Sequence, residues 1–455
     1  MGQRPSNSGI PVTLRQQIIE VFYLEIPGAS VSMPESANTK VSGTSGHPYP
    51  GEGVSVPWSI WPRLKLVAGR LLAIASILQF PAASSLAADD APRGALHVER
   101  DVVLSEGHAV SPNIIVAAPD GGYIVAGGDN ESNTEAWAVK VNREGRTVWE
   151  YLDGPPESWT DHRSGINQFH GAVVLADGST LLCGEKEINR ESFGLLTHIG
   201  SDGKVIDQQY SSPRGAENYH SSFGKCLRWG DGVVVLGTAF RWGVPGAGWL
   251  VKLNDSGKIV WETTDQEAST GDDALELPGG DLVLAASLPA PRLVRLNTKG
   301  EVVARRPLSG EAAFMRPLFN SSTMRLAISD IDSGAKSFLE VDADLHEISH
   351  SDHSEQMGIT RGYELPDHTL ILFGAIDHGG GSASIGQMKL GSALRNYQLL
   401  PLHQSGVVKD AVPTGKPHEY VLIRISVTPV PGSPQFEARN PVVVHQGLLT
   451  WVVLN

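Results

Sequence analysis

Residues 120–151 read DGGYIVAGGDNESNTEAWAVKVNREGRTVWEY, and this stretch decides the fold because copies of it follow along the chain. The copies at 177–210 and 231–263 read DGSTLLCGEKEINRESFGLLTHIGSDGKVIDQQY and DGVVVLGTAFRWGVPGAGWLVKLNDSGKIVWET. Each has a glycine turn, an apolar strand ending in glycine, a variable polar loop, a second apolar strand, another glycine turn and a last strand. Glycine suits such turns because it adopts positive φ at little steric cost.

The same order of elements continues to the end of the sequence, although the later copies are less similar to the first three. The later copies are GGDLVLAAS with PRLVRLNTKGEVVARR, STMRLAISD with KSFLEVDADLHEISH, HTLILFGAI with SIGQMKLGSALRNYQL, and EYVLIRISV with FEARNPVVVHQGLLTWVV. Another short β-prone segment precedes each copy, as in PNIIVAA, HGAVVLA and FGKCLRW. Equivalent strand ends recur roughly every 42 to 57 residues, which is the length that four short strands and their turns require.

This repeat predicts an all-β fold: a seven-bladed β-propeller of four-stranded blades over residues 97–455, with six and eight blades as alternatives. The segment ALHVERDVVLSE precedes the first copy. We expect it to pair with the last blade, because such pairing closes the ring and removes an exposed sheet edge.

The repeat resembles those of bacterial pyrroloquinoline-quinone-like and delta-60 propeller proteins. The stretches that carry the resemblance are DGGYIVAGG, AWAVKVNREGRTVW, WLVKLNDSGKIVW and RLVRLNTKGEVVA. The resemblance implies the architecture alone. Quinoprotein dehydrogenases of similar appearance have eight blades, adjacent cysteines and calcium-binding acidic residues. Cys183 and Cys226 are far apart in this chain, so the resemblance does not extend to that activity.

Composition agrees with a chain of short strands and tight turns. It contains 50 glycines and 29 prolines, and charged residues make up 19%, which excludes a coiled coil or a long disordered polymer. The formal net charge of −14 disfavours binding to nucleic acid or anionic lipid. Two cysteines are too few for a disulfide scaffold. They either pair across neighbouring blades or remain two separate buried thiols.

Residues 61–87 have the layout of a secretory signal peptide. Arg63, Lys65 and Arg70 precede the uncharged stretch LLAIASILQFPAASSLAA, in which SLA at 85–87 is a cleavage site. A transmembrane anchor is the alternative, but Pro81 and the small residues weaken the apolar run. Residues 1–60 are a disordered extension or a mis-assigned start. We therefore expect a periplasmic or secreted bacterial protein without stable membrane insertion after cleavage.

Polar residues recur where the copies, aligned on their turns, approach the mouth of the predicted central channel. They are Asn113, His170, His220, Asp272, Asp273, Arg316, Arg361, Lys409 and Asp410. This ring is a candidate site for a polar ligand, although channel mouths are often polar and such a ring can also satisfy itself.

The two histidines in this ring suggest a second interpretation. His170 and His220 occupy nearly equivalent positions in adjacent copies, so together with Asp272 and Asp273 they could hold a divalent metal. Separate hydrogen-bonded histidines are the alternative that we favour, so we expect neither a resident metal nor another cofactor.

Two loops exceed their counterparts in length and are candidates for contact with a partner. The first, within YLDGPPESWTDHRSGINQF, carries Trp159, Asp161, His162 and Arg163. The second, within AFRWGVPGAG, carries Arg241 and Trp242.

The chain contains no GxSxG, HExxH, Walker or strand-borne GxGxxG motif. The sequence therefore favours a non-catalytic binding module, with a protein partner preferred over a polar small ligand. The alternative is a propeller hydrolase or lyase acting on a sugar or lactone, with a His/Asp site at the channel mouth.

Overall fold

Twenty-eight β-strands make up the regular structure of the residues that the computed structural model describes. The structure describes residues 96–105, 110–129, 135–153, 166–188, 191–214, 220–241, 244–265, 269–288, 290–318, 321–330, 336–353, 357–376, 382–389, 396–399, 406–429 and 443–454. The predicted signal peptide at 61–87 and the extension at 1–60 lie outside these residues. Within them, no helix is long and apolar enough to cross a membrane.

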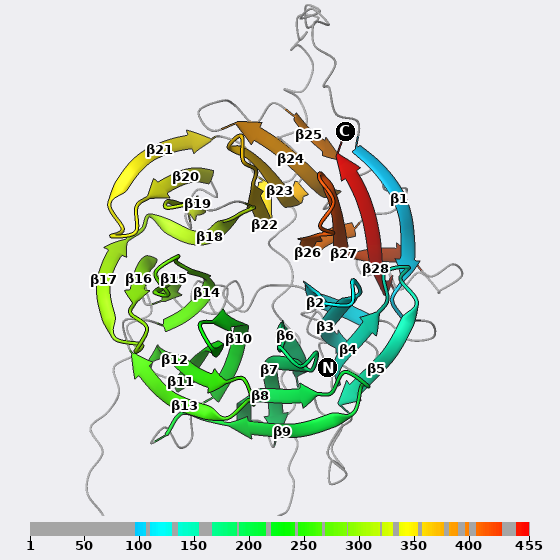
Figure 1. Cartoon of the computed structure of the whole chain (residues 1–455), viewed down its shortest axis with the longest axis horizontal. Helices are drawn as coiled ribbons and strands as arrows, with labels where there is room; N and C mark the ends of the chain where they lie inside the picture. The colour runs from blue at the N-terminus through cyan, green and yellow to red at the C-terminus, as the bar shows by residue number, and fades with distance from the viewer. Residues whose placement is uncertain are drawn as a thin grey trace, which may run out of the picture. The chain divides into compact units, whose positions relative to one another are not determined.

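The strands are arranged radially around an axis, and each repeat contributes four of them from the centre outward (Figure 1). The innermost strands are β2 (Val110–Ala117), β6 (Asn167–Val174), β10 (His220–Trp229), β14 (Ser269–Glu276), β18 (Gly310–Pro317), β22 (Met357–Glu364) and β26 (Gly406–Pro413). The second strands are β3 (Tyr123–Asp129), β7 (Thr180–Ile188), β11 (Gly232–Arg241), β15 (Leu282–Leu288), β19 (Met324–Asp330), β23 (Thr369–Ile376) and β27 (Glu419–Pro429).

The remaining strands complete each repeat on its outer side. The third strands are β4 (Ala136–Val141), β8 (Glu191–Ile199), β12 (Val244–Asn254), β16 (Arg292–Leu296), β20 (Lys336–Val341), β24 (Ser382–Lys389) and β28 (Val443–Leu454). The outermost strands are β5 (Thr147–Asp153), β9 (Val205–Ser211), β13 (Ile259–Asp265), β17 (Val302–Pro307), β21 (Glu347–His353), β25 (Asn396–Leu399) and β1 (Leu96–Val103). The all-β propeller is therefore confirmed.

The prediction of seven separate four-stranded blades is wrong. Hydrogen bonding groups the strands into six blades, five of four strands and one of eight. The eight-stranded blade arises because β18 and β22 pair in parallel, from Met315↔Gly362 to Pro317↔Glu364, and join two repeats into one sheet. A Cβ at Gly362 would lie 2.1 Å from the Met315 sulfur, so the absence of a side chain there permits this close approach.

The first strand closes the ring, as the sequence predicted. β1 pairs antiparallel with β28, from Leu96↔Leu454 to Val103↔Leu448. A polar clasp reinforces the closure: Thr450 donates to Asp101 at 2.6 Å, and Arg424 of β27 donates to Thr450 at 2.7 Å and to Asp101 at 2.6 Å. The propeller thus uses its earliest strand to complete its last blade.

Apolar side chains fill the spaces between adjacent repeats. One cluster, for example, joins Trp137 and Val139 of β4 to Val421 of β27 and Trp451 of β28. Turn glycines take part in this packing. Gly203 has a φ of +86°, and a Cβ there would lie 2.6 Å from the Trp149 side chain of the preceding blade. The repeated pairing of an outer-strand tryptophan with a turn glycine explains why both recur in the sequence.

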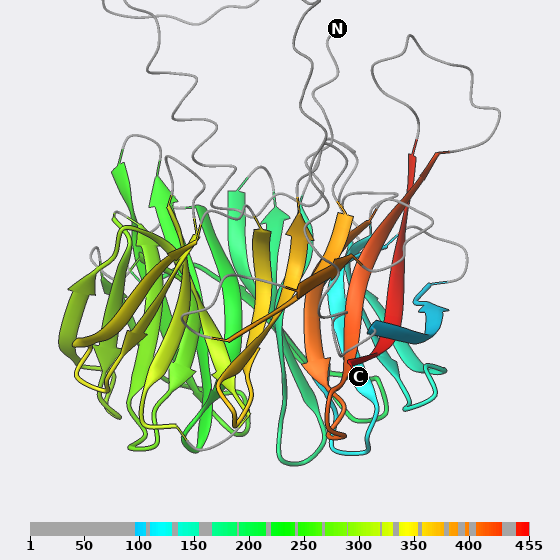
Figure 2. The ribbon, with the colours of Figure 1, turned by 90° about the horizontal axis from the view of Figure 1, so that it is seen from above.

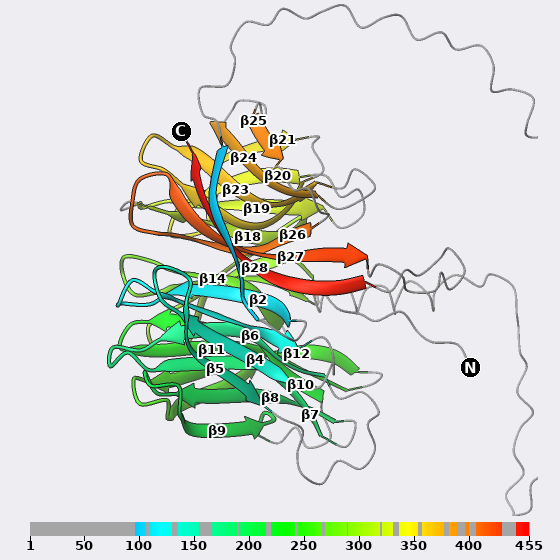
Figure 3. The same cartoon turned by 90° about the vertical axis from the view of Figure 1, so that its right-hand side faces the viewer.

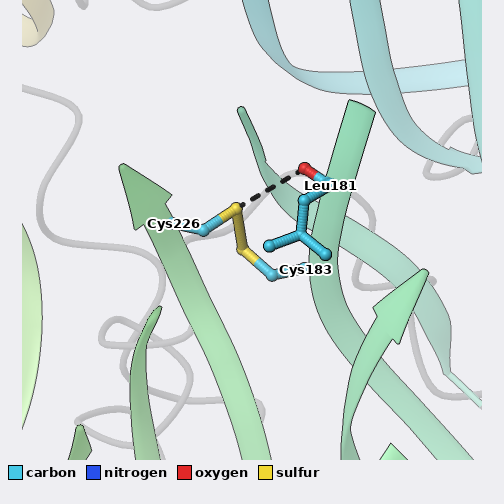
Figure 4. The surroundings of a disulfide bond; sticks show 3 residues. All are labelled: Leu181, Cys183 and Cys226. Carbon is cyan, nitrogen blue, oxygen red and sulfur yellow. Dashed lines mark hydrogen bonds between the residues drawn. A yellow bond between two sulfur atoms is a disulfide. The ribbon is translucent and has the colours of Figure 1, made fainter. Parts of the chain in front are cut away.

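Cys183 of β7 and Cys226 of β10 form a disulfide between neighbouring blades (Figure 4). This outcome resolves the alternative that the sequence left open. Both cysteines are buried, and Gly171 of β6 makes room for them, since a Cβ at this position would lie 2.6 Å from the Cys183 sulfur.

The two faces of the propeller differ in their connections. The described turns that lead from a first to a second strand, or from a third to a fourth, lie on one face, which we call the turn face (Figure 2). On the opposite face, which we call the loop face, the second strands end and the third strands begin. On the loop face, the second-to-third strand connection spans two residues between Arg241 and Val244 but thirteen between Pro429 and Val443.

Candidate ligand site on the innermost strands

A β-bulge recurs at the same place in the innermost strands. The pairing register with the second strand shifts at Asn113, His170, Gly224, Asp272, Thr360 and Lys409. β18 pairs with β19 without such a shift. Because a bulge leaves one residue unpaired and re-aims its neighbours, these strands present polar residues part-way along their length.

Asp273, which directly follows the bulge in β14, is the centre of a buried ionic cluster. Lys225 of β10 and Arg316 of β18 both donate to its Oδ1 atom, Arg316 at 2.5 Å. The backbone N–H of Phe314 donates to Oδ2 at 3.0 Å. One carboxylate therefore links three neighbouring innermost strands.

The charges in this cluster act on one another. Burial raises the pKa of Asp273, but Arg316, Lys225 and Arg361 outweigh that effect and hold the pKa well below its usual range. Burial lowers the pKa of the Lys225 ammonium, with Arg361 and Arg316 acting in the same direction and Asp273 against it. Asp273 is thus ionised, and the positive charges around it repel one another.

Asp410 repeats this arrangement on β26. Arg361 of β22 donates from Nε to its Oδ1 atom at 2.6 Å, and the backbone N–H of Ile115 in β2 donates to Oδ2 at 3.1 Å. Burial opposes the charged form of Arg361, but Asp410 raises the pKa of the guanidinium above its ordinary value. Tyr363 stands beside this pair and donates to the Ala411 carbonyl at 2.7 Å. Burial lowers the pKa of Lys409, the bulge residue next to Asp410.

The structure does not bring the two predicted histidines together with Asp273. His170 Nε2 lies 3.6 Å from Glu185 Oε1, within its own blade. The His220 ring stacks on Phe240 at 5.3 Å, and its Nδ1 accepts from the backbone N–H of Ser192 at 3.3 Å. In the part of the chain that the structure describes, no group of three or more His, Cys, Asp or Glu could hold a metal ion.

Asn113 joins two neighbouring innermost strands, because its side-chain amide in β2 donates to the Phe169 carbonyl of β6 at 2.9 Å. Asp272 lies in β14, but its side chain is outside the description. The predicted partner-contact residues Trp159, Asp161, His162, Arg163 and Trp242 lie outside the described residues. The expectation that the connection carrying Arg241 and Trp242 is longer than its counterparts is wrong. β11 ends at Arg241 and β12 begins at Val244, because both strands extend into the stretch that the sequence indicated as loop. The side chain of Arg241 is not described.

Sequence reasoning missed Lys225, although a signal was present. Lys225 precedes Asp231 by six residues, just as Arg361 precedes Asp367 and Asp273 precedes Gly279 by six. Alignment on the turn that follows each innermost strand would have placed the lysine in register with the charged residues of other repeats. Its apolar context, FGKCLRW, hid it within what resembles a core strand.

Neither a protein-family model nor a curated protein matches this sequence. Among solved structures, the chain is similar to streptogramin B lyase, with 12% identity and a TM-score of 0.49 over 79% of this chain and 98% of that chain. It is also similar to the WD40 domain of Neurospora crassa Pan2, with 10% identity and a TM-score of 0.47 over 79% and 96%. A protein of unknown function from Bacteroides caccae matches with 11% identity and a TM-score of 0.40 over 61% and 94%. At these values the likenesses carry no argument about function.

Proposed function

We propose that this chain is an exported, non-catalytic binding module that holds a protein partner on the loop face of its propeller. The observation that carries the proposal is a projecting ribbon formed by the ends of β27 and β28 (Figure 3). These strands stay paired as far as Pro429↔Val443. β26, however, begins opposite Ser426, and β1 ends opposite Leu448.

The ribbon therefore extends past the strands that flank it. In this extension Val427 pairs with His445, Thr428 with Val444 and Pro429 with Val443, beyond the four-stranded part of the blade. A two-stranded ribbon is only marginally stable in water, and its edges offer backbone groups to an added strand. β-strand addition is a common way for a sheet edge to bind a protein segment.

Two observations support export to the periplasm or the cell exterior. The signal-like stretch at 61–87 precedes the first strand, and the buried disulfide between Cys183 and Cys226 belongs to the class of bonds that persist in oxidising compartments. We further infer, from the repeat stretches quoted above, kinship with the pyrroloquinoline-quinone-like propeller repeats. The alternative, a hydrolase or lyase with a His/Asp site, has less support, because His170 lies near Glu185 and His220 stacks on Phe240, away from Asp273 among the described contacts.

Site-specific photo-crosslinking in the producing bacterium tests the binding proposal. A photoreactive residue at Thr428 on the ribbon should give a discrete adduct with one protein, whereas the same residue at Lys299 on the turn face should not. Shortening the ribbon, by joining Ser426 to Gln446 through Asn-Gly, should abolish capture of that protein without lowering the melting temperature of the propeller. Equal adducts from both positions, or none from Thr428, would overturn the proposal.

Export has a separate test. Cell fractionation and N-terminal sequencing of the full chain should recover a mature protein that begins at Ala88 in the periplasm or medium. Recovery of the intact chain in the cytoplasm would refute export but not partner binding.

A further inference from the structure

We propose that the protein binds a small anion, carrying a carboxylate or phosphate group, near the propeller axis between Lys225, Arg316 and Arg361. These residues come from three different innermost strands, β10, β18 and β22. Lys225 and Arg316 meet at Asp273. Arg361 lies on the strand next to Arg316, because β22 pairs in parallel with β18 and Arg316 is opposite Tyr363. Three cations thus lie on neighbouring innermost strands.

The protein's own carboxylates do not match the hydrogen-bond donors of these cations. Oδ1 of Asp273 accepts from the backbone N–H of Ala274 as well as from both cations, and its Oδ2 accepts from Phe314 N. Asp410 likewise accepts from the backbone N–H groups of Ile115 and Ala411.

Backbone amides therefore occupy acceptor positions that the cations would otherwise use. Each guanidinium has five N–H donors and an ammonium has three. Arg316 directs one nitrogen to Asp273, and Arg361 directs its Nε to Asp410. An anion with two or three oxygens would supply acceptors for the remaining donors.

The three cations are largely buried but remain partly exposed to solvent. The side chains of Lys225, Arg316 and Arg361 are 17%, 23% and 13% exposed. A low-dielectric wall strengthens the attraction of such groups for an anion, while partial exposure lets a small ligand reach them. Arginine recognises carboxylate and phosphate in the same two-pronged manner, so both anions belong to the predicted class.

This proposal is independent of partner binding on the loop face, because it involves the innermost strands alone. Succinate, inorganic phosphate and chloride, each titrated into the full mature chain at equal ionic strength, will test it by calorimetry. We expect saturable one-site binding of succinate or phosphate. The anion that binds more tightly will show whether the site prefers a carboxylate or a phosphate group. Binding no tighter than that of chloride by either anion would overturn the proposal.

Two variants locate the site. Arg316→Gln should weaken binding of the preferred anion by about tenfold or more, because it removes a charged donor. Arg306→Gln is the matched control, since Arg306 pairs with Glu347 on the outer strands and its loss removes the same charge. Arg316→Lys, which keeps the charge but not the planar fork, should give an intermediate affinity and provides a second folded variant. Unchanged affinity in Arg316→Gln, or equal loss in Arg306→Gln, would contradict the assignment.

Discussion

On one side of β10, Cys226 forms a disulfide with Cys183 of β7; on the other side, Lys225 forms an ion pair with Asp273 of β14. These two residues are adjacent in sequence. Because successive side chains of a strand point to opposite faces, one strand holds two neighbouring blades by two different kinds of chemistry.

The two attachments differ in what can undo them. The disulfide resists acid but depends on an oxidising environment. The ionic cluster is insensitive to reductant, but its strength depends on the ionisation of a carboxylate. The comparison shows that a propeller junction need not rely on apolar packing alone, and it can be tested from each side separately.

The largest expected effect comes from removing the shared carboxylate. Asp273→Ala would leave the largely buried cations of Lys225 and Arg316 without their common partner, so we expect a loss of about 3 kcal/mol in the free energy of unfolding. Urea denaturation at pH 7 measures this loss. Asp255→Ala, which breaks the exposed ion pair with Arg228, is the control and should cost less than about 1 kcal/mol.

The same substitution predicts a pH dependence. Because the pKa of Asp273 is lower in the folded than in the unfolded chain, its stabilisation is complete above the unfolded value of about 4. The stabilisation is lost as the pH falls through the folded value. The difference between wild type and Asp273→Ala should therefore narrow below about pH 4. A difference that stays constant down to pH 2 would argue against an ionised Asp273.

Next in size is the covalent attachment. The double substitution Cys183→Ala with Cys226→Ala should lower the free energy of unfolding by about 2–4 kcal/mol, because the bond closes a loop between residues 43 apart. Reductant should destabilise the wild type by a similar amount and leave the double variant unchanged. Identical stability of oxidised and reduced wild type would show that the disulfide does not support this junction.

A smaller effect is expected from crowding the disulfide. The Cβ of Gly171→Ala would lie 2.6 Å from both the Cys183 sulfur and the Cys226 backbone nitrogen, so we expect a cost of about 1–3 kcal/mol. Gly224→Ala is the matched control, because its Cβ would meet only the Leu236 carbonyl at 3.9 Å. Thermal unfolding of both variants gives the comparison. Equal melting temperatures would mean that the site at Gly171 can relax.

The smallest single effect should come from Lys225→Met, at about 1 kcal/mol or less, because Asp273 keeps Arg316 and the Phe314 N–H. A double-mutant cycle makes the test sharper. In the Asp273→Ala background, Lys225→Met should stabilise the protein, since it removes a buried cation that has lost its partner. Destabilisation in both backgrounds would show that the lysine contributes through packing rather than charge.

The propeller could be predicted from the sequence because its elements repeat. The joining of two blades into one sheet could not. The glycine turns and their tryptophans, such as Gly203 with Trp149, recur at regular intervals because each blade repeats the same contact. Pairing of β18 with β22 depends on the close approach of Met315 to Gly362, a contact that occurs once and follows no period. A unique contact leaves no pattern in a single sequence.

The candidate site shows the same division. Asp273, Arg316, Arg361 and Asp410 were predicted and do lie in ionic contacts between innermost strands. His170 and His220 were predicted beside them, but His170 lies near Glu185 of its own blade, and His220 stacks on Phe240 and accepts from Ser192 of the neighbouring blade. Turn-based alignment places a residue along the strand, while the local bulge and twist decide the direction of its side chain.

Closure of the ring by β1 and β28 also has a consequence for assembly. Asp101 and Thr450, which meet in the clasp, are separated by 349 positions. β1 leaves the ribosome well before β28 and cannot pair until that strand has been made, so the ring closes only after the other blades have been synthesised. A polypeptide cut short before Val443 would keep β1 as an open edge, prone to association with other unfinished copies.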